Sequence, residues 1–225
     1  MSVQFDFLSV LSEWPILLRG ILWTIGLTTI SSVLGVFSGL AFAWLRTRNK
    51  LFLNGVIKIY VELIRNTPFI VQLFFVFFGL PQLGIRLSAE ESSVLAMVIN
   101  LSAYSTEILR AGIESTSPAQ IQAGESLGLS PLQVFKYIVL PPALFRVWPA
   151  LVAQIIIVML GSAVCGQIST EELSYAANLI QSRNFRAFEA FMIAALIYLC
   201  LSIFVRWFLN LIAENFIFKG LIRNG

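Results

Sequence analysis

Histidine is absent from this chain of 225 residues, and cysteine occurs only twice. The absence of histidine excludes a histidine-containing metal site and a Ser-His-Asp or Cys-His catalytic centre. Charged residues are scarce too, at 12% of the chain against about 25% in soluble domains. Hydrophobic residues reach 58% and the mean hydropathy is +0.85. This composition predicts an integral membrane protein.

Other features that the sequence lacks narrow its function. No G-x-x-x-x-G-K-[ST] phosphate loop occurs, so we expect no ATP hydrolysis by this chain. The first residues contain an aspartate and no basic residue, which argues against a cleavable signal peptide. Cys165 and Cys200 lie in apolar runs without CxxC spacing, which favours buried free thiols over a disulfide or a metal pair.

Apolar runs predict an all-α polytopic bundle with five membrane spans and one domain, residues 1–225. A straight span needs about 20 residues. The expected spans cover residues 17–45, 66–80, 92–112, 148–168 and 188–212. Residues 51–65 mix apolar side chains with Lys58, Glu62 and Arg65, so we expect an interfacial helix there. Residues 81–91 are expected to form an external turn, and residues 170–184 an external loop or short surface helix.

The distribution of lysine and arginine predicts the orientation in the membrane. With the N-terminus external and the C-terminus cytosolic, eleven basic residues lie at or near the cytosol and four outside, as the positive-inside rule requires. The cytosolic residues are Arg46, Arg48, Lys50, Lys58, Arg65, Arg110, Lys136, Arg146, Arg206, Lys219 and Arg223; the external ones are Arg19, Arg86, Arg183 and Arg186. Because these charges lie at membrane edges, we expect contact with lipid and no nucleic acid partner.

Small residues recur every fourth position in the first span. They are Ser31, Gly35, Gly39 and Ala43. Such a stripe lets two helix backbones approach closely in lipid. It predicts close helix packing, either inside one subunit or between two.

Residues 117–142 separate two apolar runs and carry two helix-start signals. Each signal has a serine N-cap, a proline at the first helical position and a glutamine that can reach back to the cap. The two sets are Ser117, Pro118 and Gln120, and Ser130, Pro131 and Gln133. Gly128 suits a left-handed turn between them, and Pro141 and Pro142 are expected to end the second helix. Two helices this short cannot cross a membrane, so we expect a hairpin at or beyond the membrane surface. The distribution of basic residues predicts that this surface is the cytosolic one.

The hairpin resembles the EAA loop of bacterial ABC-importer permeases. In that family the pattern is EAA, three residues, glycine, and a hydrophobic stretch that ends in LP. The residues that carry the resemblance are Gln122, Ala123, Gly124, Glu125, Ser126, Leu127, Gly128, Phe135, Leu140 and Pro141. Gln122 replaces the usual glutamate and Gly124 the second alanine. Residues 65–68 and 180–198 resemble the polar amino acid branch of the family, and the likeness covers nearly the whole chain.

The resemblance implies a type I, MetI-like permease in a bacterial inner membrane. Its loop would be a coupling helix that docks on a dimer of cytosolic ABC ATPases, which would hold the ATP and magnesium, so this chain would need no cofactor. Leu127, Leu132, Phe135 and Val139 would anchor the hairpin, while Ala123 and Gly124 allow close approach. The alternative is a hairpin resting on lipid headgroups. A second permease, the same chain or a similar one, and an external or periplasmic solute-binding protein are the other implied partners, and the substrate would be a polar amino acid or a derivative such as an opine.

Several polar residues are candidates to line a substrate path. They are Asn66, Thr67, Gln72, Asn100, Tyr104, Glu107, Gln154 and Ser162. Pro68 frees the carbonyl of Ile64, and such broken helix ends face protein or a water-filled cavity in membranes. Capping of the helix is the alternative role for the residues near it. Glu107 precedes Arg110 by three positions, which predicts an internal ion pair or helix-end role, with substrate contact as the alternative.

The fourth span departs from the pattern of similar amino acid permeases. Where those commonly read KDTSL, this chain has Leu160, Gly161, Ser162, Ala163 and Val164. Without the aspartate, the sequence does not support a site that grips a lysine or arginine side chain. The small residues leave room for a larger substrate.

Two other functional classes, a secondary transporter and a membrane enzyme, fit these sequence features less well. A secondary transporter or channel for a small polar solute is the alternative function, but secondary transporters usually show paired repeats, and five spans do not divide evenly. A membrane enzyme would need a cluster of catalytic side chains, whereas the acidic residues here are scattered.

Overall fold

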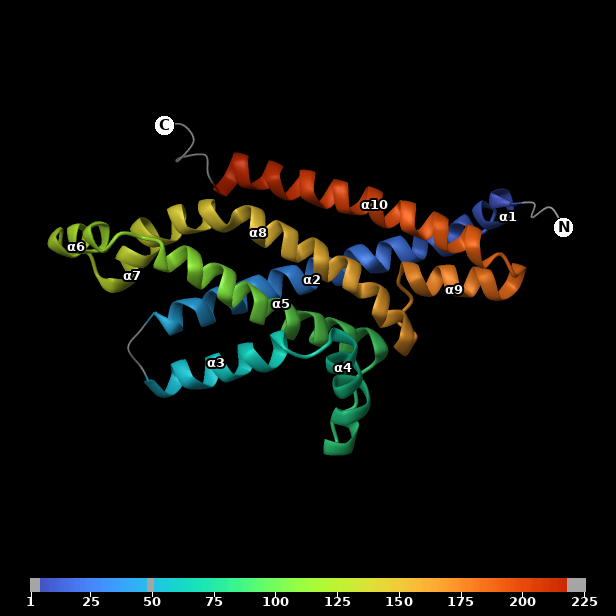
Figure 1. The fold of residues 1–225 in the computed structure, drawn as a ribbon, viewed down its shortest axis with the longest axis horizontal. Helices are drawn as coiled ribbons and strands as arrows, with labels where there is room; N and C mark the ends of the chain where they lie inside the picture. The colour runs from blue at the N-terminus through green and yellow to red at the C-terminus, as the bar shows by residue number, and fades with distance from the viewer. Residues whose placement is uncertain (1–4, 48–50, 218–225) are drawn as a thin grey trace.

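The computed structural model describes residues 5–47 and 51–217, and every regular element in them is helical. Four helical runs are long and apolar enough to cross a membrane, and a bent pair of helices makes a fifth if it is counted as one span. The four runs are Trp14–Arg46, Ala89–Glu114, Pro131–Ile168 and Ala187–Asn215. They run along one axis of an elongated bundle (Figure 1). The predicted all-α, polytopic fold is confirmed.

The centre of the bundle is the contact between α2 (Trp14–Arg46) and α5 (Ala89–Glu114). All four small residues of the stripe on α2 are buried. A Cβ atom on Gly39 would lie 2.6 Å from the Cβ of Ser105, and one on Gly35 would lie 2.9 Å from the Cβ of Leu101. The stripe therefore packs inside one chain, as the first of its two interpretations predicts.

The second crossing differs from the prediction. Residues 51–65 form α3 (Leu51–Arg65), which lies beside α2 and α5 in the bundle and buries Ile57 and Val61 (Figure 1). The chain then bends by 110° into α4 (Phe69–Phe74), a π-helical turn η1 (Phe75–Gly79) and a 3-10 turn η2 (Leu80–Leu83). Pro68 lacks an N–H and forces an extended backbone, so α3 ends before it. No straight span over residues 66–80 forms, and α3 is no separate surface helix.

The fourth span starts earlier than predicted, because Pro141 and Pro142 do not end the helix before them. A continuous helical run joins α7 (Pro131–Val134), the π-helical turn η3 (Phe135–Val139), α8 (Leu140–Gly161) and the 3-10 turn η4 (Ser162–Ile168). The N–H of Leu140 donates to the carbonyl of Phe135, five residues back. This wider turn leaves the prolines in the first turn of α8, where missing N–H groups are tolerated.

The C-terminal part of the chain packs α9 (Leu173–Asn184) against α2 and α10 (Ala187–Ile212). Leu173, Ala177 and Ile180 are fully buried, so the predicted loop or surface helix is a helix with a core-facing side. A short π-helical turn η5 (Ala213–Ile217) follows α10. Both cysteines are free, but only Cys165 is buried; the prediction of a buried thiol is wrong for Cys200, which is exposed on α10.

The two ends of the bundle carry different elements. The hairpin of α6 (Pro118–Ser126) and α7 lies at one end, near the C-terminal ends of α2 and α10 (Figure 1). The short helix α1 (Phe7–Leu11) and α9 lie at the other end. Arg46 therefore shares an end with the hairpin, as the charge pattern predicts. Arg48, Lys50, Lys219 and Arg223, which also entered the charge pattern, lie outside the described residues.

Candidate coupling hairpin and transport path

Serine caps fix the start of both hairpin helices. The Ser130 hydroxyl accepts a bond from the Gln133 N–H, and the Gln133 side chain accepts one from the Ser130 N–H at 2.8 Å, so the predicted capping box forms. At the first helix, Ser117 Oγ accepts from the Ala119 N–H at 3.2 Å. Within the described part of the chain, Gln120 makes no return bond to Ser117. Each helix therefore has a fixed start, and only the second has the complete box.

Gly128 makes the turn between the two helices. Its φ of +76° lies in the left-handed region, as predicted. Its N–H donates to the Glu125 carbonyl at 2.9 Å, and the Leu129 N–H donates to the Gly124 carbonyl at 3.3 Å. These bonds satisfy carbonyls at the end of α6 and fix the angle between the helices.

Three residues expected to meet a partner contact other residues of this chain. Gly124 is buried, and a Cβ atom there would overlap Cδ1 of Ile138. Val139 is 5% exposed, and the ring of Phe135 lies 5.6 Å from the ring of Trp44 on α2. Gly124 and Val139 are covered by the chain itself and hold the hairpin together, while the half-buried Phe135 packs it against α2. Burial of Val139 contradicts the prediction that it anchors a partner, whereas the anchoring role of the half-buried Phe135 stays a prediction.

The outward face of the hairpin carries the remaining apolar residues. Leu127 is 79% exposed and Leu132 is 57% exposed. Around them, Gln122, Ala123, Glu125 and Ser126 are exposed, while Leu140 and Pro141 are half-buried where the hairpin joins α8. Large exposed leucines at the end of a bundle, next to small and polar side chains, form a surface suited to a helix-in-groove contact.

An ion-pair network links α2 and α5 immediately before the hairpin. The Glu107 carboxylate contacts both Arg46 on α2 and Arg110, as the predicted internal ion pair requires. Arg110 also pairs with Glu114 at 2.6 Å, and Arg146 of α8 donates to the Ser115 carbonyl at 2.8 Å. These bonds join the end of α2 to α5, which leads into the hairpin, and join α5 to α8, which leads out of it. Sequence reasoning missed Arg46, which lies 61 residues from Glu107.

The break after α3 gathers several of the predicted path residues. Gln72 Nε2 donates to the Ile64 carbonyl at 2.7 Å, so it satisfies the acceptor that Pro68 leaves free. It also donates to the Thr67 hydroxyl at 2.9 Å, and its Oε1 accepts from Asn100 at 3.0 Å. Asn66, by contrast, caps α3 by donating to the Glu62 carbonyl. The structure thus brings Thr67, Gln72 and Asn100 together.

Other predicted path residues lie near this group, on α8 or at the start of η4. The Tyr104 hydroxyl donates to the Arg65 carbonyl at 3.4 Å, and the Arg65 guanidinium lies 5.4 Å from the Tyr104 ring. Gln154 is buried on α8. Ser162 is fully buried and donates to the Met159 carbonyl at 2.6 Å.

A small hollow of about 100 Å³ lies between α4, α5 and α8. It is lined by Phe69, Asn100, Ile157, Val158 and Gly161. A Cβ atom on Gly161 would meet only the edge of the Phe69 ring, at 4.0 Å, so the glycine leaves the hollow open. Among the lining residues Asn100 carries the polar side chain, and none is charged. Phe69 and Ile157 carry no polar signal by which sequence reasoning could have found them.

Comparison with known proteins places this arrangement in a family. Residues 31–217 match the family of binding-protein-dependent transport system inner membrane components. The chain belongs to this family. It is therefore the permease subunit of an ABC importer for amino acids, a multi-pass protein of the bacterial inner membrane that works with an ATPase and a binding protein. Permeases of this family carry no nucleotide site and are not themselves catalytic.

The permease is similar to curated relatives along most of its length. It is 35% identical over 202 residues to the probable glutamine ABC transporter permease protein GlnP of Bacillus subtilis, covering 88% of this chain and 93% of the relative. It is 31% identical over 210 residues to the glutamine transport system permease protein of Escherichia coli, covering 92% and 96%. The nopaline transport system permease protein NocM of Agrobacterium fabrum is 29% identical over 222 residues, covering 91% and 92%.

Solved structures show the same fold. The crystal structure of an amino acid ABC transporter with histidines has a chain that is 34% identical, with a TM-score of 0.84 over 94% of the permease and 99% of that chain. The MetNI methionine ABC transporter, in an inward-facing conformation, has a chain with a TM-score of 0.72 at 18% identity, over 88% and 95%. The second likeness concerns the fold alone and agrees with the predicted MetI-like architecture.

Proposed function

We propose that residues 117–142 are the element through which a dimer of cytosolic ATPases drives this permease. The observation that carries the proposal is the two-sided hairpin: Gly124 and Val139 are buried within it, while Leu127 and Leu132 are exposed on its outward face. A body fixed by caps and internal packing moves as a unit when its outward face is held in a groove. The network around Glu107 then passes that motion to α2 and α5.

The proposed assembly contains two permeases. Four or five spans are few to enclose a polar path, so a second copy or a similar chain completes it. The N-terminus lies outside and the hairpin inside, which agrees with the basic Arg46, Arg110 and Arg146 at the hairpin end of the described bundle. The end that carries α1 and α9 then faces the external solute-binding protein.

The proposed substrate is a polar amino acid, or an opine-like derivative of one, without a cationic side chain. Asn100 and Gly161 line the hollow between α4, α5 and α8, and no acidic residue lines it. An amide can donate to or accept from a polar substrate, whereas a lysine or arginine side chain would need a carboxylate to replace its hydration. Thr67 and Gln72 join Asn100 on one side of this path. The names of relatives that refer to glutamine support this choice.

Filling the hollow should weaken transport without dismantling the importer. In Gly161→Leu the new side chain occupies space beside Phe69, and we expect the KM for glutamine uptake into proteoliposomes to rise by about tenfold, equivalent to about 1.4 kcal/mol. The matched control is Gly26→Leu, where no atom lies within 4 Å of a new Cβ. An unchanged KM in Gly161→Leu, or an equal change in the control, would remove the hollow from the path.

The proposed coupling is tested by uptake into membrane vesicles. We expect uptake to stop when internal ATP is withheld and to continue after an ionophore collapses the ion gradients. Uptake that follows the ion gradient and ignores ATP would instead identify a secondary transporter. In a separate experiment, purification of the tagged chain from its native membrane should recover the ATPase and any second permease together with it.

A further inference from the structure

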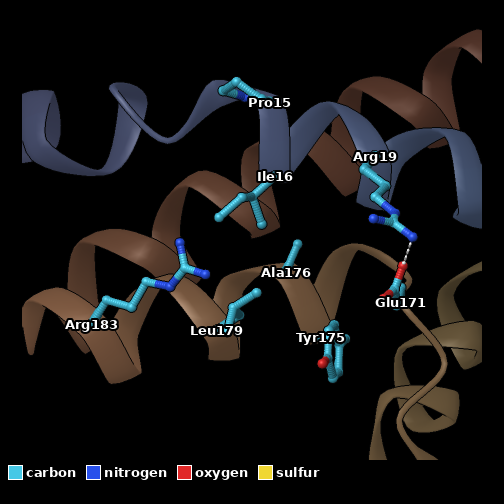
Figure 2. Close-up of a pocket in the computed structure, with 8 residues that line it drawn as sticks. All are labelled: Pro15, Ile16, Arg19, Glu171, Tyr175, Ala176, Leu179 and Arg183. Atoms are coloured by element: carbon cyan, nitrogen blue, oxygen red, sulfur yellow. Dashed lines mark ion pairs between the residues drawn. The ribbon is translucent and has the colours of Figure 1, made fainter.

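A second hollow, of about 400 Å³, lies between the start of α2 and α9 (Figure 2). The start of α2 and α9 are at the end of the bundle away from the hairpin (Figure 1). Ile16, Ala176 and Leu179 contribute apolar surface to it. Charged side chains stand around this surface: Arg19 and Glu171 at one end and Arg183 at the other (Figure 2). The hollow plays no part in the transport path described above, which lies between α4, α5 and α8.

The two arginines are exposed and only partly engaged within the chain. Arg19 pairs with Glu171 at 2.6 Å and its side chain is 68% exposed; Arg183 pairs with Glu13 at 3.6 Å and its side chain is 54% exposed. A guanidinium has five N–H donors, so one carboxylate does not exhaust it. Exposed ion pairs contribute little stability and exchange readily with an incoming partner. Each arginine can therefore accept a further carboxylate.

We propose that this hollow is a docking site for the external solute-binding protein, which presents a carboxylate side chain to each of Arg19 and Arg183 and covers the apolar surface between them. This proposal rests on the proposed function, because it needs the α9 end of the bundle to face outside. Arginines beside a partly apolar hollow are typical of the residues that dominate protein interfaces. Charges of both signs at its edge would fix the orientation of the docked protein.

Buried polar contacts connect α9 to the spans. Glu172, next to Glu171, is fully buried at the start of α9 and accepts bonds from the Ser174 and Tyr175 N–H groups and from the Tyr198 hydroxyl on α10. Burial raises the pKa of Glu172, and the bonds it accepts oppose that rise. A movement of α9 under a docked protein therefore reaches α10 through a side chain without solvent contact.

Further contacts join α9 and the segment before it to α2 and α5. The Leu173 N–H donates to the Thr24 hydroxyl on α2 at 3.2 Å, and the hydroxyls of Thr170 and Ser93 on α5 lie 2.8 Å apart. Ser169 and Phe185, on either side of α9, have left-handed φ values of 67° and 58°. Residues other than glycine rarely adopt this conformation, so η4 ends at Ser169 and α9 ends at Phe185 in sharply defined turns.

An anionic lipid headgroup is the other occupant that arginines could attract. Glu171 and Glu13 stand beside these arginines and repel a phosphate. A protein surface can present an ammonium or amide to the glutamates as well as a carboxylate to the arginines. The charge pattern therefore favours the protein.

The test measures ATPase activity of the complete importer in nanodiscs of neutral lipid while its solute-binding protein is titrated. For Arg19→Glu and Arg183→Glu we expect the concentration that gives half-maximal stimulation to rise by about tenfold or more. The basal ATPase rate and the amount of ATPase that co-purifies should match the unmodified importer. Those two readouts separate failure of docking from failure of the proposed coupling.

Arg86→Glu is the matched control, because it makes the same charge change in the loop before α5, outside the hollow. It should leave the half-maximal concentration unchanged. Equal effects of Arg86→Glu and Arg19→Glu would overturn the proposal, since they would reflect general repulsion. An unchanged half-maximal concentration in both hollow variants would overturn it too, as would an effect that appears only when anionic lipid is present.

Discussion

Gly124→Val should leave the permease in the membrane but without its ATPase. Gly124 is buried in the hairpin, and a Cβ atom there would overlap the Ile138 side chain. Overpacking of this kind costs about 1–3 kcal/mol, which is large for a hairpin of two short helices. The helices must separate, and the outward face with Leu127 and Leu132 loses its shape. We expect ATPase recovery with the tagged permease to fall by about tenfold or more.

A second substitution distinguishes this steric effect from a lost contact with the partner. Ile138→Ala removes the side chain that valine would meet, so Gly124→Val combined with Ile138→Ala should recover a substantial part of the bound ATPase. Insertion into the membrane, measured by the amount of extracted permease, should be similar for all variants. Full ATPase recovery with Gly124→Val alone would show that the hairpin tolerates a bulkier residue and that its described packing does not matter for docking.

Gly39→Val should abolish the folded permease altogether. The new Cβ would lie 2.6 Å from the Cβ of Ser105 and 3.0 Å from the Ser102 carbonyl oxygen, and neither neighbour can move without shifting α5. Because α2 and α5 pack against each other at the centre of the bundle, the two helices must move apart to make room for the new side chain. We expect a loss of at least about 1–3 kcal/mol and little monodisperse protein in detergent, as measured by size-exclusion chromatography.

Gly26→Val on the same helix is the control. No atom lies within 4 Å of a Cβ at that position, so the substitution has the same effect on helix propensity without the clash. It should elute as the unmodified permease does. If Gly39→Val also yields a monodisperse peak and unchanged thermal stability, the close approach of α2 and α5 at this point is not needed for folding.

Local features of the hairpin could be predicted from sequence because neighbouring residues determine them. Ser130 and Gln133 cap a helix within one turn, and Gly128 adopts a left-handed conformation that the turn itself requires. The pair of Glu107 and Arg110 follows from helical spacing in the same way. The stripe of small residues on α2 predicts a packing face. The sequence does not, however, identify the helix that packs against it.

Features that depend on distant residues could not be read in this way. Gly124 is needed because Ile138 lies against it, and Glu107 also binds Arg46, 61 residues away. The course of α3 depends on α5, where the Tyr60 hydroxyl donates to the Ile99 carbonyl at 2.8 Å. Pro141 was expected to end a helix, but the preceding π-helical turn carries the chain past it. Hydrophobic periodicity does not reveal such a turn.

The candidate transport path also combines features that the sequence predicts with features that it does not. Pro68 was expected to free the Ile64 carbonyl, and Gln72 is the side chain that reaches it. The polar residues were therefore found from their type and position. The hollow beside Asn100, however, is closed by apolar walls such as Phe69 and Ile157, which look like any other residue of a membrane span.

The side of the membrane on which the hairpin lies is the most direct test of the proposed coupling. In a permease with Cys165→Ala and Cys200→Ala, the exposed Leu132 is changed to cysteine and treated with a maleimide that cannot cross membranes. We expect labelling in inside-out vesicles, protection when ATPase is bound, and no labelling in right-side-out vesicles. Labelling of Leu132→Cys from the outside alone, with or without ATPase, would contradict the proposed coupling.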